Sequence, residues 1–282
     1  MTVRVAVMQM CSGQDREANL AVAAGLLEAA ARAGAKLAVL PENFAFLGRD
    51  ETGRIAVAEP FGDGPAQAFL AERARTLGLW IVGGTVPLLE PGESIPRAAS
   101  LLYAADGSLV ARYDKLHLFD VSLPEGNEGY RESAGTAPGR NVVVANSPLG
   151  RLGLAVCYDV RFPELFRAMA EAGLEAISLP AAFTVPTGRA HWELLVRARA
   201  VENLSFVLAA AQWGTHEGGR NTWGDSMIVD YWGDVLGRRR EGVGIVVADL
   251  DFEAQHALRS RFPVLVHRHP SATLKLQEED QT

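Results

Sequence analysis

The stretch Arg151-Leu-Gly-Leu-Ala-Val-Cys157-Tyr-Asp-Val-Arg161-Phe-Pro-Glu164-Leu-Phe-Arg167 joins a strand pattern to a helix pattern. The apolar run over 152–156 has the length and composition of a buried strand. Pro163, which is tolerated in the first helical turn, and the acid that follows it predict a helix over 163–172. We therefore expect Cys157 at the turn between the two elements, where backbone N–H groups at a helix start can face a substrate.

The chain also opens with alternating strand and helix patterns. Residues 3–9 alternate and are β-branched as in a strand, 16–34 have helical spacing, and 36–40 form a second apolar strand. Such a β–α–β start predicts a parallel pair of strands covered by a helix. No short repeat or linker-like change of composition interrupts the sequence. We interpret residues 1–282 as one α/β domain.

The remaining patterns continue in the same style. A hairpin signal at 105–107 joins two strand patterns, and the long stretch 115–140, rich in Gly, Pro and charge, has the length of a functional loop. A turn at 231–234 is expected between the last two strands. The other predicted elements are a helix over 64–78, strands over 79–86, 98–103, 108–113, 141–145, 175–179, 206–211, 226–230 and 244–249, a turn over 180–186 and a helix over about 187–203.

Composition argues against several classes of protein. The chain is 48% hydrophobic and 22% charged, which is usual for a globular protein, and its net charge of -7 without a basic block argues against a nucleic-acid binder. No apolar run approaches the roughly 20 residues of a membrane span, and the N-terminus enters a strand pattern directly. Cys11 and Cys157 are the only cysteines, so we expect no disulfide framework and a reducing, cytoplasmic setting.

Three chemically capable residues follow apolar strands, and each has an ordinary alternative. Glu42 lies beyond the strand at 36–40, where α/β folds place their sites, but a solvated loop acid is also consistent. Lys115 can stabilise an oxyanion, or can be a surface lysine. Cys157 is a candidate nucleophile or a buried core thiol. Cys11, with no charged neighbours immediately beyond it, is expected to be a core thiol.

Other chemistries fit the sequence poorly. Arg161 lies four residues after Cys157, whereas a phosphatase loop needs an arginine six residues after its cysteine, and no Gly-x-Ser-x-Gly elbow occurs. The pair His267 and His269 lacks a third ligand motif and is interpreted as part of a basic terminal segment. Gly83-Gly84 lacks dinucleotide-loop spacing and is expected to allow close backbone packing.

Three motifs in order strengthen the case for catalysis. They are Leu40-Pro41-Glu42-Asn43-Phe44, Tyr113-Asp114-Lys115-Leu116-His117-Leu118-Phe119-Asp120-Val121 and the stretch around Cys157 quoted above. Together they resemble the Glu–Lys–Cys motifs of the nitrilase superfamily of carbon–nitrogen hydrolases. The segments 179–193 and 197–202 most resemble its Nit branch. The resemblance covers nearly the whole chain.

The resemblance implies a role for each member of the triad. Glu42 would be the general base, Cys157 the nucleophile that forms a thioester, and Lys115 the cation at the oxyanion, assisted by the backbone N–H of Tyr158. Glu132 resembles the accessory glutamate of the family, with Glu125 as its rival. No metal or organic cofactor is implied.

The same resemblance implies the architecture and the substrate-binding wall. It implies a four-layer αββα sandwich, a homodimer, and a C-terminal arm over about 259–282. Tyr158, Phe183 and Thr184 are expected to contact substrate. Asp225 stands where many relatives carry histidine, so no role is assigned to that position.

The Nit branch implies an amidase that hydrolyses the side-chain amide of a small 2-oxo acid. Deaminated glutathione, giving 2-oxoglutarate and cysteinylglycine, is the leading substrate. An ω-amidase acting on 2-oxoglutaramate is the alternative, and a catalytically silent dimeric scaffold is the alternative from another class. Arg161 and Arg189 are candidates for the substrate carboxylate, although Arg161 is expected to pair with an acid such as Glu164.

Overall fold

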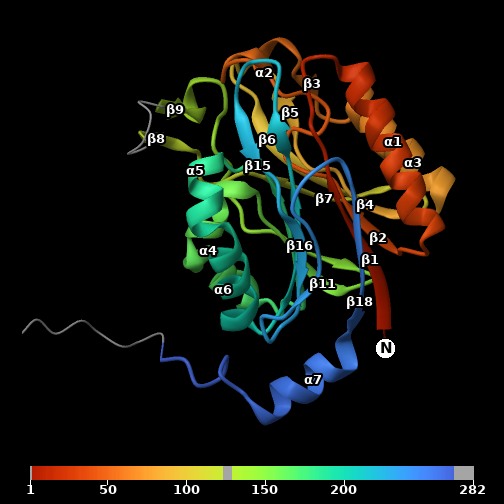
Figure 1. Cartoon of the computed structure of the whole chain (residues 1–282), viewed down its shortest axis with the longest axis vertical. Coiled ribbons are helices and arrows are strands. Elements are labelled where there is room, and N and C mark those ends of the chain that lie inside the picture. Colours follow the sequence, from red (N-terminus) through yellow and green to blue (C-terminus); the bar gives the residue numbers. More distant parts are fainter. Residues whose placement is uncertain (1, 123–128, 270–282) are drawn as a thin grey trace, which may run out of the picture.

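The protein is a sandwich of two sheets with helices on both outer faces. The computed structural model describes residues 2–122 and 129–269. Figure 1 shows α1 (Arg16–Arg32) and α3 (Pro65–Leu77) covering one sheet, and α4 (Pro163–Glu171) and α6 (Glu193–Asn203) covering the other. This is the four-layer αββα arrangement that the family resemblance implied.

The first sheet contains eight strands of the described chain. Strands β1 and β2 are parallel, as the opening β–α–β pattern predicts, and β7 pairs with β6 in the predicted hairpin. In spatial order the sheet contains β18 (Gly244–Asp251), β1 (Thr2–Gln9), β2 (Leu37–Val39), β4 (Trp80–Val82), β6 (Arg97–Tyr103), β5 (Val86–Leu89) and β3 (Glu59–Pro60), with β7 (Leu109–Asp114) on β6.

The second sheet contains six strands within the described residues, and two small hairpins lie outside both sheets. Its order is β10 (Val144–Ser147), β11 (Gly150–Leu154), β12 (Ala176–Ala181), β13 (Phe206–Ala211), β16 (Ser226–Val229) and β17 (Val235–Arg239). The hairpins are β8 (Asp120–Ser122) with β9 (Gly129–Arg131), and β14 (Trp213–Thr215) with β15 (Asn221–Trp223).

The alternation of β1 explains why helices and a second sheet cover its two faces. Val5 and Val7 belong to the core cluster that contains Leu154 and Ile177 of the second sheet. Ala6, between them, points the other way and joins the cluster formed with the helices α1 and α3. Successive side chains of a strand face opposite sides, so one apolar strand builds both cores.

The strand predicted over 79–86 is wrong, because it is divided into β4 and β5. Gly84 between them has φ +50°, and a Cβ there would lie 2.0 Å from the carbonyl oxygen of Pro41. Only glycine allows this approach, which confirms the close backbone packing expected at Gly83-Gly84. The break lets β5 pair with both β6 and β3.

Three further predictions need correction. The turn 231–234 precedes β17 rather than the last strand, the turn expected over 180–186 begins later because β12 continues to Ala181, and the strand expected over 141–145 is β10 at Val144–Ser147. The helix expected over 187–203 begins with α5 (Val185–Thr187) and contains a π-helical turn (Gly188–Trp192) before α6. Short helices α2 (Gly53–Ala56) and α7 (Phe252–Arg261) were not predicted. None of the described helices is long and apolar enough to cross a membrane.

Candidate active site

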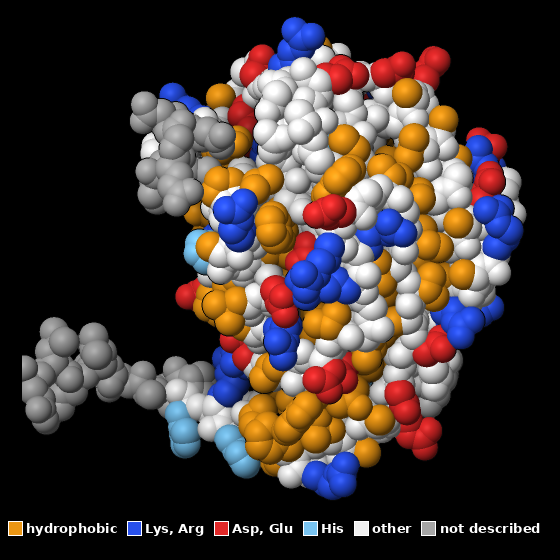
Figure 2. Space-filling view, in the orientation of Figure 1, with side chains coloured by type: hydrophobic (Ala, Val, Ile, Leu, Met, Phe, Trp, Pro, Cys, Tyr) orange, Lys and Arg blue, Asp and Glu red, His pale blue; other side chains and the backbone are white. Residues whose placement is uncertain are grey.

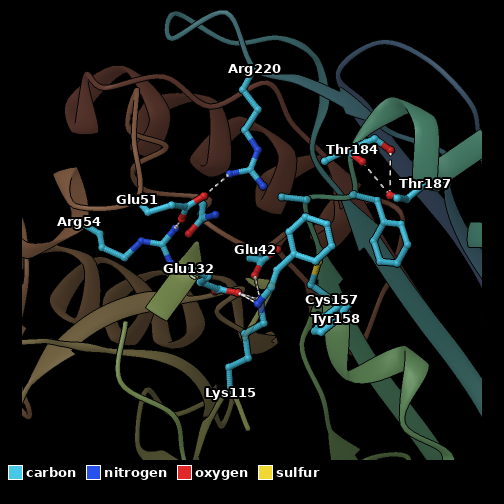
Figure 3. Close-up of a pocket in the computed structure, with 14 residues that line it drawn as sticks. Glu42, Glu51, Arg54, Lys115, Glu132, Cys157, Tyr158, Thr184, Thr187 and Arg220 are labelled. Carbon is cyan, nitrogen blue, oxygen red and sulfur yellow. Dashed lines mark hydrogen bonds and ion pairs between the residues drawn. The ribbon is translucent and has the colours of Figure 1, made fainter. Parts of the chain in front are cut away.

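A pocket collects the chemically capable residues at the ends of several strands. It offers about 390 Å³ of open space, counted together with the solvent at its mouth. Figure 3 shows Glu42, Lys115, Glu132 and Cys157 facing one another in it. Glu42 follows β2, Lys115 follows β7, Cys157 follows β11, and Glu132 begins the 3₁₀ turn Glu132–Ala134. The pocket also has Asn43, Glu51, Arg54, Phe119, Tyr158, Ala182, Phe183, Thr184, Thr187 and Arg220 in its wall.

Cys157 lies on a constrained turn between β11 and α4. It begins a 3₁₀ turn (Cys157–Arg161) with φ +50°, a left-handed conformation that is uncommon for residues other than glycine. Burial raises the pKa of its thiol well above the ordinary value, and the charge of Glu42 adds to this, partly offset by Lys115. The raised pKa favours the protonated thiol, whose proton needs an acceptor before attack.

Lys115 connects the two carboxylates of the pocket. Its Nζ donates to Glu42 Oε1 at 2.8 Å and to both carboxylate oxygens of Glu132 at 2.9 and 2.8 Å. All three residues are buried, so neither a solvated acid at 42 nor a surface lysine at 115 describes them. Burial alone would lower the pKa of Lys115, but Glu132 and Glu42 outweigh it and raise that pKa, so the ammonium stays charged.

Glu132 is held from three sides. Beyond Lys115, it accepts the backbone N–H of Phe119 at 2.7 Å and Nη1 of Arg54 at 3.3 Å. Burial opposes its ionisation, but Lys115 and Arg54 together keep the pKa of Glu132 below its ordinary value. Its rival at position 125 lies outside the described residues.

Alternating charges continue from Glu132 to the rim of the pocket. Arg54 Nη2 donates to Glu51 Oε2 at 2.6 Å, and Arg220 Nη1 donates to Glu51 Oε1 at 3.2 Å. Glu42, Lys115, Glu132, Arg54, Glu51 and Arg220 thus form a chain in which each charge contacts its opposite. Sequence reasoning missed Glu51, Arg54 and Arg220, because no local pattern connects these residues to the triad.

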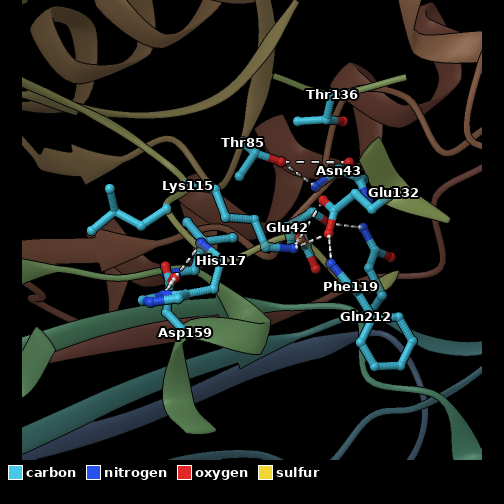
Figure 4. Close-up of polar contacts among 12 residues, drawn as sticks. Glu42, Asn43, Thr85, Lys115, His117, Phe119, Glu132, Thr136, Asp159 and Gln212 are labelled. Atoms are coloured by element: carbon cyan, nitrogen blue, oxygen red, sulfur yellow. Dashed lines mark hydrogen bonds and ion pairs between the residues drawn. The ribbon is translucent and has the colours of Figure 1, made fainter. Parts of the chain in front are cut away.

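Asp159 is a fourth residue to which sequence reasoning assigned no role. It is fully buried and accepts from Tyr113 Oη at 2.7 Å and from the backbone N–H of Val156 at 2.9 Å. It also contacts His117, at 3.1 Å from the backbone nitrogen and 2.7 Å from Nδ1. Asp159 therefore ties the segment that carries Lys115 to the turn that begins at Cys157, and Figure 4 shows its contact with His117.

The backbone around Glu42 is held by other strands. Gln212 Nε2 donates to the carbonyl oxygen of Glu42 at 3.0 Å, and the backbone N–H of Asn43 donates to Thr85 Oγ1 at 2.8 Å. Asn43 itself has φ +58°. Together with the contact between Gly84 and Pro41, these bonds fix where the carboxylate enters the pocket.

The residues expected to contact substrate lie in the pocket wall. Tyr158, Phe183 and Thr184 all line it, and the hydroxyl of Thr184 lies 2.8 Å from that of Thr187. Arg161 packs against two of these residues, with its guanidinium carbon 5.8 Å and 5.3 Å from the ring centroids of Tyr158 and Phe183.

The structure corrects the expected partner of Arg161. Within the described residues it forms no ion pair with Glu164 or another acid, and Nη1 contacts His191 Nδ1 at 3.3 Å. Burial lowers the pKa of this guanidinium. An arginine that is partly desolvated without a carboxylate suits an anionic ligand.

Three other positions that the sequence singled out lie outside the pocket. Asp225, with φ +63°, forms a bidentate pair with Arg238 at 2.6 and 2.7 Å and does not line the pocket. Cys11 is exposed, so the expected core thiol is wrong there. Among residues 2–122 and 129–269, which include His267 and His269, no three or more His, Cys, Asp or Glu side chains are grouped so that they could hold a metal ion.

Comparison with known proteins identifies the class of protein that this fold and pocket define. Residues 4–260 match the family model "Carbon-nitrogen hydrolase", and the chain belongs to that family. It is 42% identical to "Deaminated glutathione amidase" of Yersinia enterocolitica, over 93% of this chain and 92% of the relative. The three sequence motifs thus indicated the correct family.

Solved structures agree on the fold. Saccharomyces cerevisiae Nit3, described as a member of branch 10 of the nitrilase superfamily, aligns with a TM-score of 0.84 and 32% identity over 93% of this chain and 95% of that one. A mutant of the amidase from Nesterenkonia sp. AN1 aligns with a TM-score of 0.75 and 28% identity over 94% and 95% of the two chains. That structure shows the acetamide moiety of fluoroacetamide added covalently at its active-site cysteine.

Proposed function

We propose that this carbon–nitrogen hydrolase is a cysteine-dependent amidase whose substrate is deaminated glutathione, which it cleaves to 2-oxoglutarate and cysteinylglycine. The observation that carries the substrate is the 42% identity over 93% of the chain to the Yersinia enterocolitica relative of that name. The observation that supports the chemistry is the burial of Glu42, Lys115 and Cys157 in one pocket.

The first half of the reaction forms a thioester. The Cys157 sulfur attacks the amide carbon while its proton passes to Glu42, whose charge already acts on the thiol. Negative charge develops on the amide oxygen, where the Lys115 ammonium and the backbone N–H of Tyr158 stabilise it. The carbon–nitrogen bond then breaks, and the leaving amine takes the proton from Glu42.

The second half releases the acid. Water enters, Glu42 removes a proton from it, and the resulting hydroxide attacks the thioester carbon. The carbon–sulfur bond breaks, and the proton returns from Glu42 to the sulfur. Glu132 keeps Lys115 charged and in place through two hydrogen bonds, without exchanging protons itself.

The 2-oxo acid carboxylate needs a cation near the pocket. We assign this role to Arg161, because its guanidinium packs on the rings of Tyr158 and Phe183 and forms no ion pair within the described residues. The triad treats deaminated glutathione and 2-oxoglutaramate alike, since both present the same acyl half. Discrimination between them rests on the leaving group.

Turnover measurements decide between the substrates. We expect a higher kcat/KM for deaminated glutathione than for 2-oxoglutaramate, and negligible turnover of the first compound would refute the proposed substrate in favour of an ω-amidase. Cys157→Ala and Glu42→Gln should be inactive but folded, with Cys11→Ala as the active control. Intact-mass detection of an acyl adduct that is lost in Cys157→Ala would refute the silent-scaffold alternative.

We also propose that the protein is a cytoplasmic homodimer. Both cysteines are free, as in a reducing compartment. Exposed apolar side chains lie near the end of α7: Trp232 and Phe262 are 56% and 46% exposed and their ring centroids lie 5.9 Å apart, and Val266 is 80% exposed. Figure 2 shows hydrophobic side chains gathered at this lower end of the molecule. Light scattering of the purified protein tests the dimer, and a monomer mass would refute it.

The segment proposed as a C-terminal arm begins within the fold. Arg259 belongs to α7 and donates through Nη2 to the carbonyl oxygens of Leu174 and Leu204 of its own chain. Phe262 to His269 follow the helix, and 270–282 lie outside the described residues. We propose the arm over about 259–282, so that its first residues belong to the end of α7.

A further inference from the structure

A second, larger cavity adjoins the catalytic pocket. It offers about 1280 Å³ of open space, against about 390 Å³ in the pocket. We call it the hairpin groove, because the β14–β15 hairpin forms much of its wall. Its principal side chains are Tyr130, Trp213, Arg220, Trp223, Arg238 and Arg240.

The groove and the pocket meet at Arg220, which lines both. Its guanidinium carbon lies 5.0 Å from the ring centroid of Tyr130, and its Nη1 contacts Glu51 of the pocket. The short segment 184–187 forms a second common boundary, because Thr184 and Thr187 line the pocket and the two residues between them line the groove. A molecule that extends past Arg220 passes from one cavity into the other.

The groove carries more arginine than acid. Arg238 is neutralised by Asp225 and Glu193, and Arg220 is paired with Glu51. Arg240 lines the groove, is exposed, and forms no ion pair with any described residue. The acids that line the groove are Asp225 and Glu241. The groove thus offers one arginine that can bind an anion without first giving up a carboxylate.

We propose that the hairpin groove binds the peptide leaving group of the amide substrate, with the terminal carboxylate of that peptide at Arg240. This inference rests on the proposed function, because it concerns the half of deaminated glutathione that is released as the amine when the acyl half becomes bonded to Cys157. An ammonia leaving group needs no such space, whereas a dipeptide exceeds what a pocket already holding the acyl half can enclose. The indoles of Trp213 and Trp223 supply flat apolar surface along its length.

The test compares two substrates that differ only at the end of the leaving group. We would measure kcat/KM for deaminated glutathione and for the same compound with an amidated glycine. The wild-type protein should prefer the free acid by about three- to fivefold, the upper range for an exposed ion pair. Arg240→Gln should bring the ratio close to one, and because both substrates report on the same variant, a loss of folded protein cancels.

Arg75→Gln, an exposed arginine on α3 that lines neither cavity, is the matched control and should keep the wild-type ratio. An unchanged ratio in Arg240→Gln, or no preference in the wild type, would overturn the groove as a carboxylate site while leaving the proposed function intact. Absence of turnover of deaminated glutathione by the wild type would overturn the proposed function, and this inference with it.

Discussion

Both carboxylate oxygens of Glu132 lie against the ammonium of Lys115, at 2.9 and 2.8 Å. This buried lysine therefore donates hydrogen bonds to two carboxylates, since Glu42 Oε1 also lies 2.8 Å from the same nitrogen. The cation proposed for the oxyanion is thus held by a carboxylate that is separate from the proposed base. This division of labour leaves Glu42 free to exchange protons while Lys115 stays in position.

Glu132→Gln should lower kcat/KM about 10²-fold, as expected when an oxyanion donor loses its alignment. Removing one of the two carboxylates that raise the pKa of Lys115 should also lower that pKa, so the charged ammonium is lost at a lower pH. The alkaline limb of the pH–rate profile should move to lower pH. Glu72→Gln, on an exposed site of α3, is the control. A near-normal rate in Glu132→Gln would remove its positioning role.

Arg54→Met should move the acid limb of the pH–rate profile to higher pH. Lys115 and Arg54 together overcome burial and lower the pKa of Glu132, so its ionised form persists to low pH in the wild type. Without Arg54 that pKa rises, and Glu132 is protonated earlier as the pH falls. The stability that its depressed pKa contributes, present above the unfolded pKa, should likewise be lost sooner on acidification.

The conservative variant distinguishes charge from shape at this position. Arg54→Lys loses the fork that reaches Glu51 and Glu132 together. It keeps the positive charge, so its acid limb should lie at a pH close to that of the wild type. Profiles of kcat/KM for the three proteins, with folding checked by circular dichroism, make the comparison. Identical acid limbs in wild type and Arg54→Met would exclude the coupling.

The sequence predicts a site residue where a local pattern marks it, and misses one whose role depends on a partner far away in the sequence. Glu42, Lys115 and Cys157 each follow an apolar strand, so strand patterns and family motifs located them. Arg54 gives no such signal, because its contact with Glu132 spans 78 positions and joins the short helix α2 to a 3₁₀ turn. Asp159 gave a weak signal, because it is a charged residue only two positions after Cys157. The structure shows it fully buried.

The fold shows the same limit. Strands with apolar runs were located within a few residues, but β17 (Val235–Arg239) contains two arginines, and the apolar criterion does not select it. The break between β4 and β5 is set by the backbone of Pro41, which is distant in sequence from Gly84. Tertiary contacts of this kind are absent from local patterns.

Asp159→Asn should destabilise the protein by about 2–4 kcal/mol, because a buried carboxylate that accepts several hydrogen bonds is replaced by an amide with donors facing donors. Asparagine keeps one acceptor oxygen, so either Tyr113 and Val156 or His117 would face the new amide donors, and the tie between the segment carrying Lys115 and the turn of Cys157 would weaken. Urea unfolding measures the stability, and Asp63→Asn on the surface is the control. A change below about 0.5 kcal/mol would contradict the bracing role.

Gly84→Ala should reduce activity much more than Gly78→Ala. Both glycines have a left-handed backbone, with φ +50° and +59°, so an alanine costs each about 1 kcal/mol in strain. Only at Gly84 would the new Cβ lie 2.0 Å from Pro41 O, whereas nothing lies within 4 Å at Gly78. Relieving that overlap must displace the backbone next to Glu42, and a shift of about 1 Å at a catalytic group can cost about 10²-fold in rate. Steady-state kinetics and thermal unfolding of both variants separate the effects, and equal kcat/KM values would show that this glycine does not position the base.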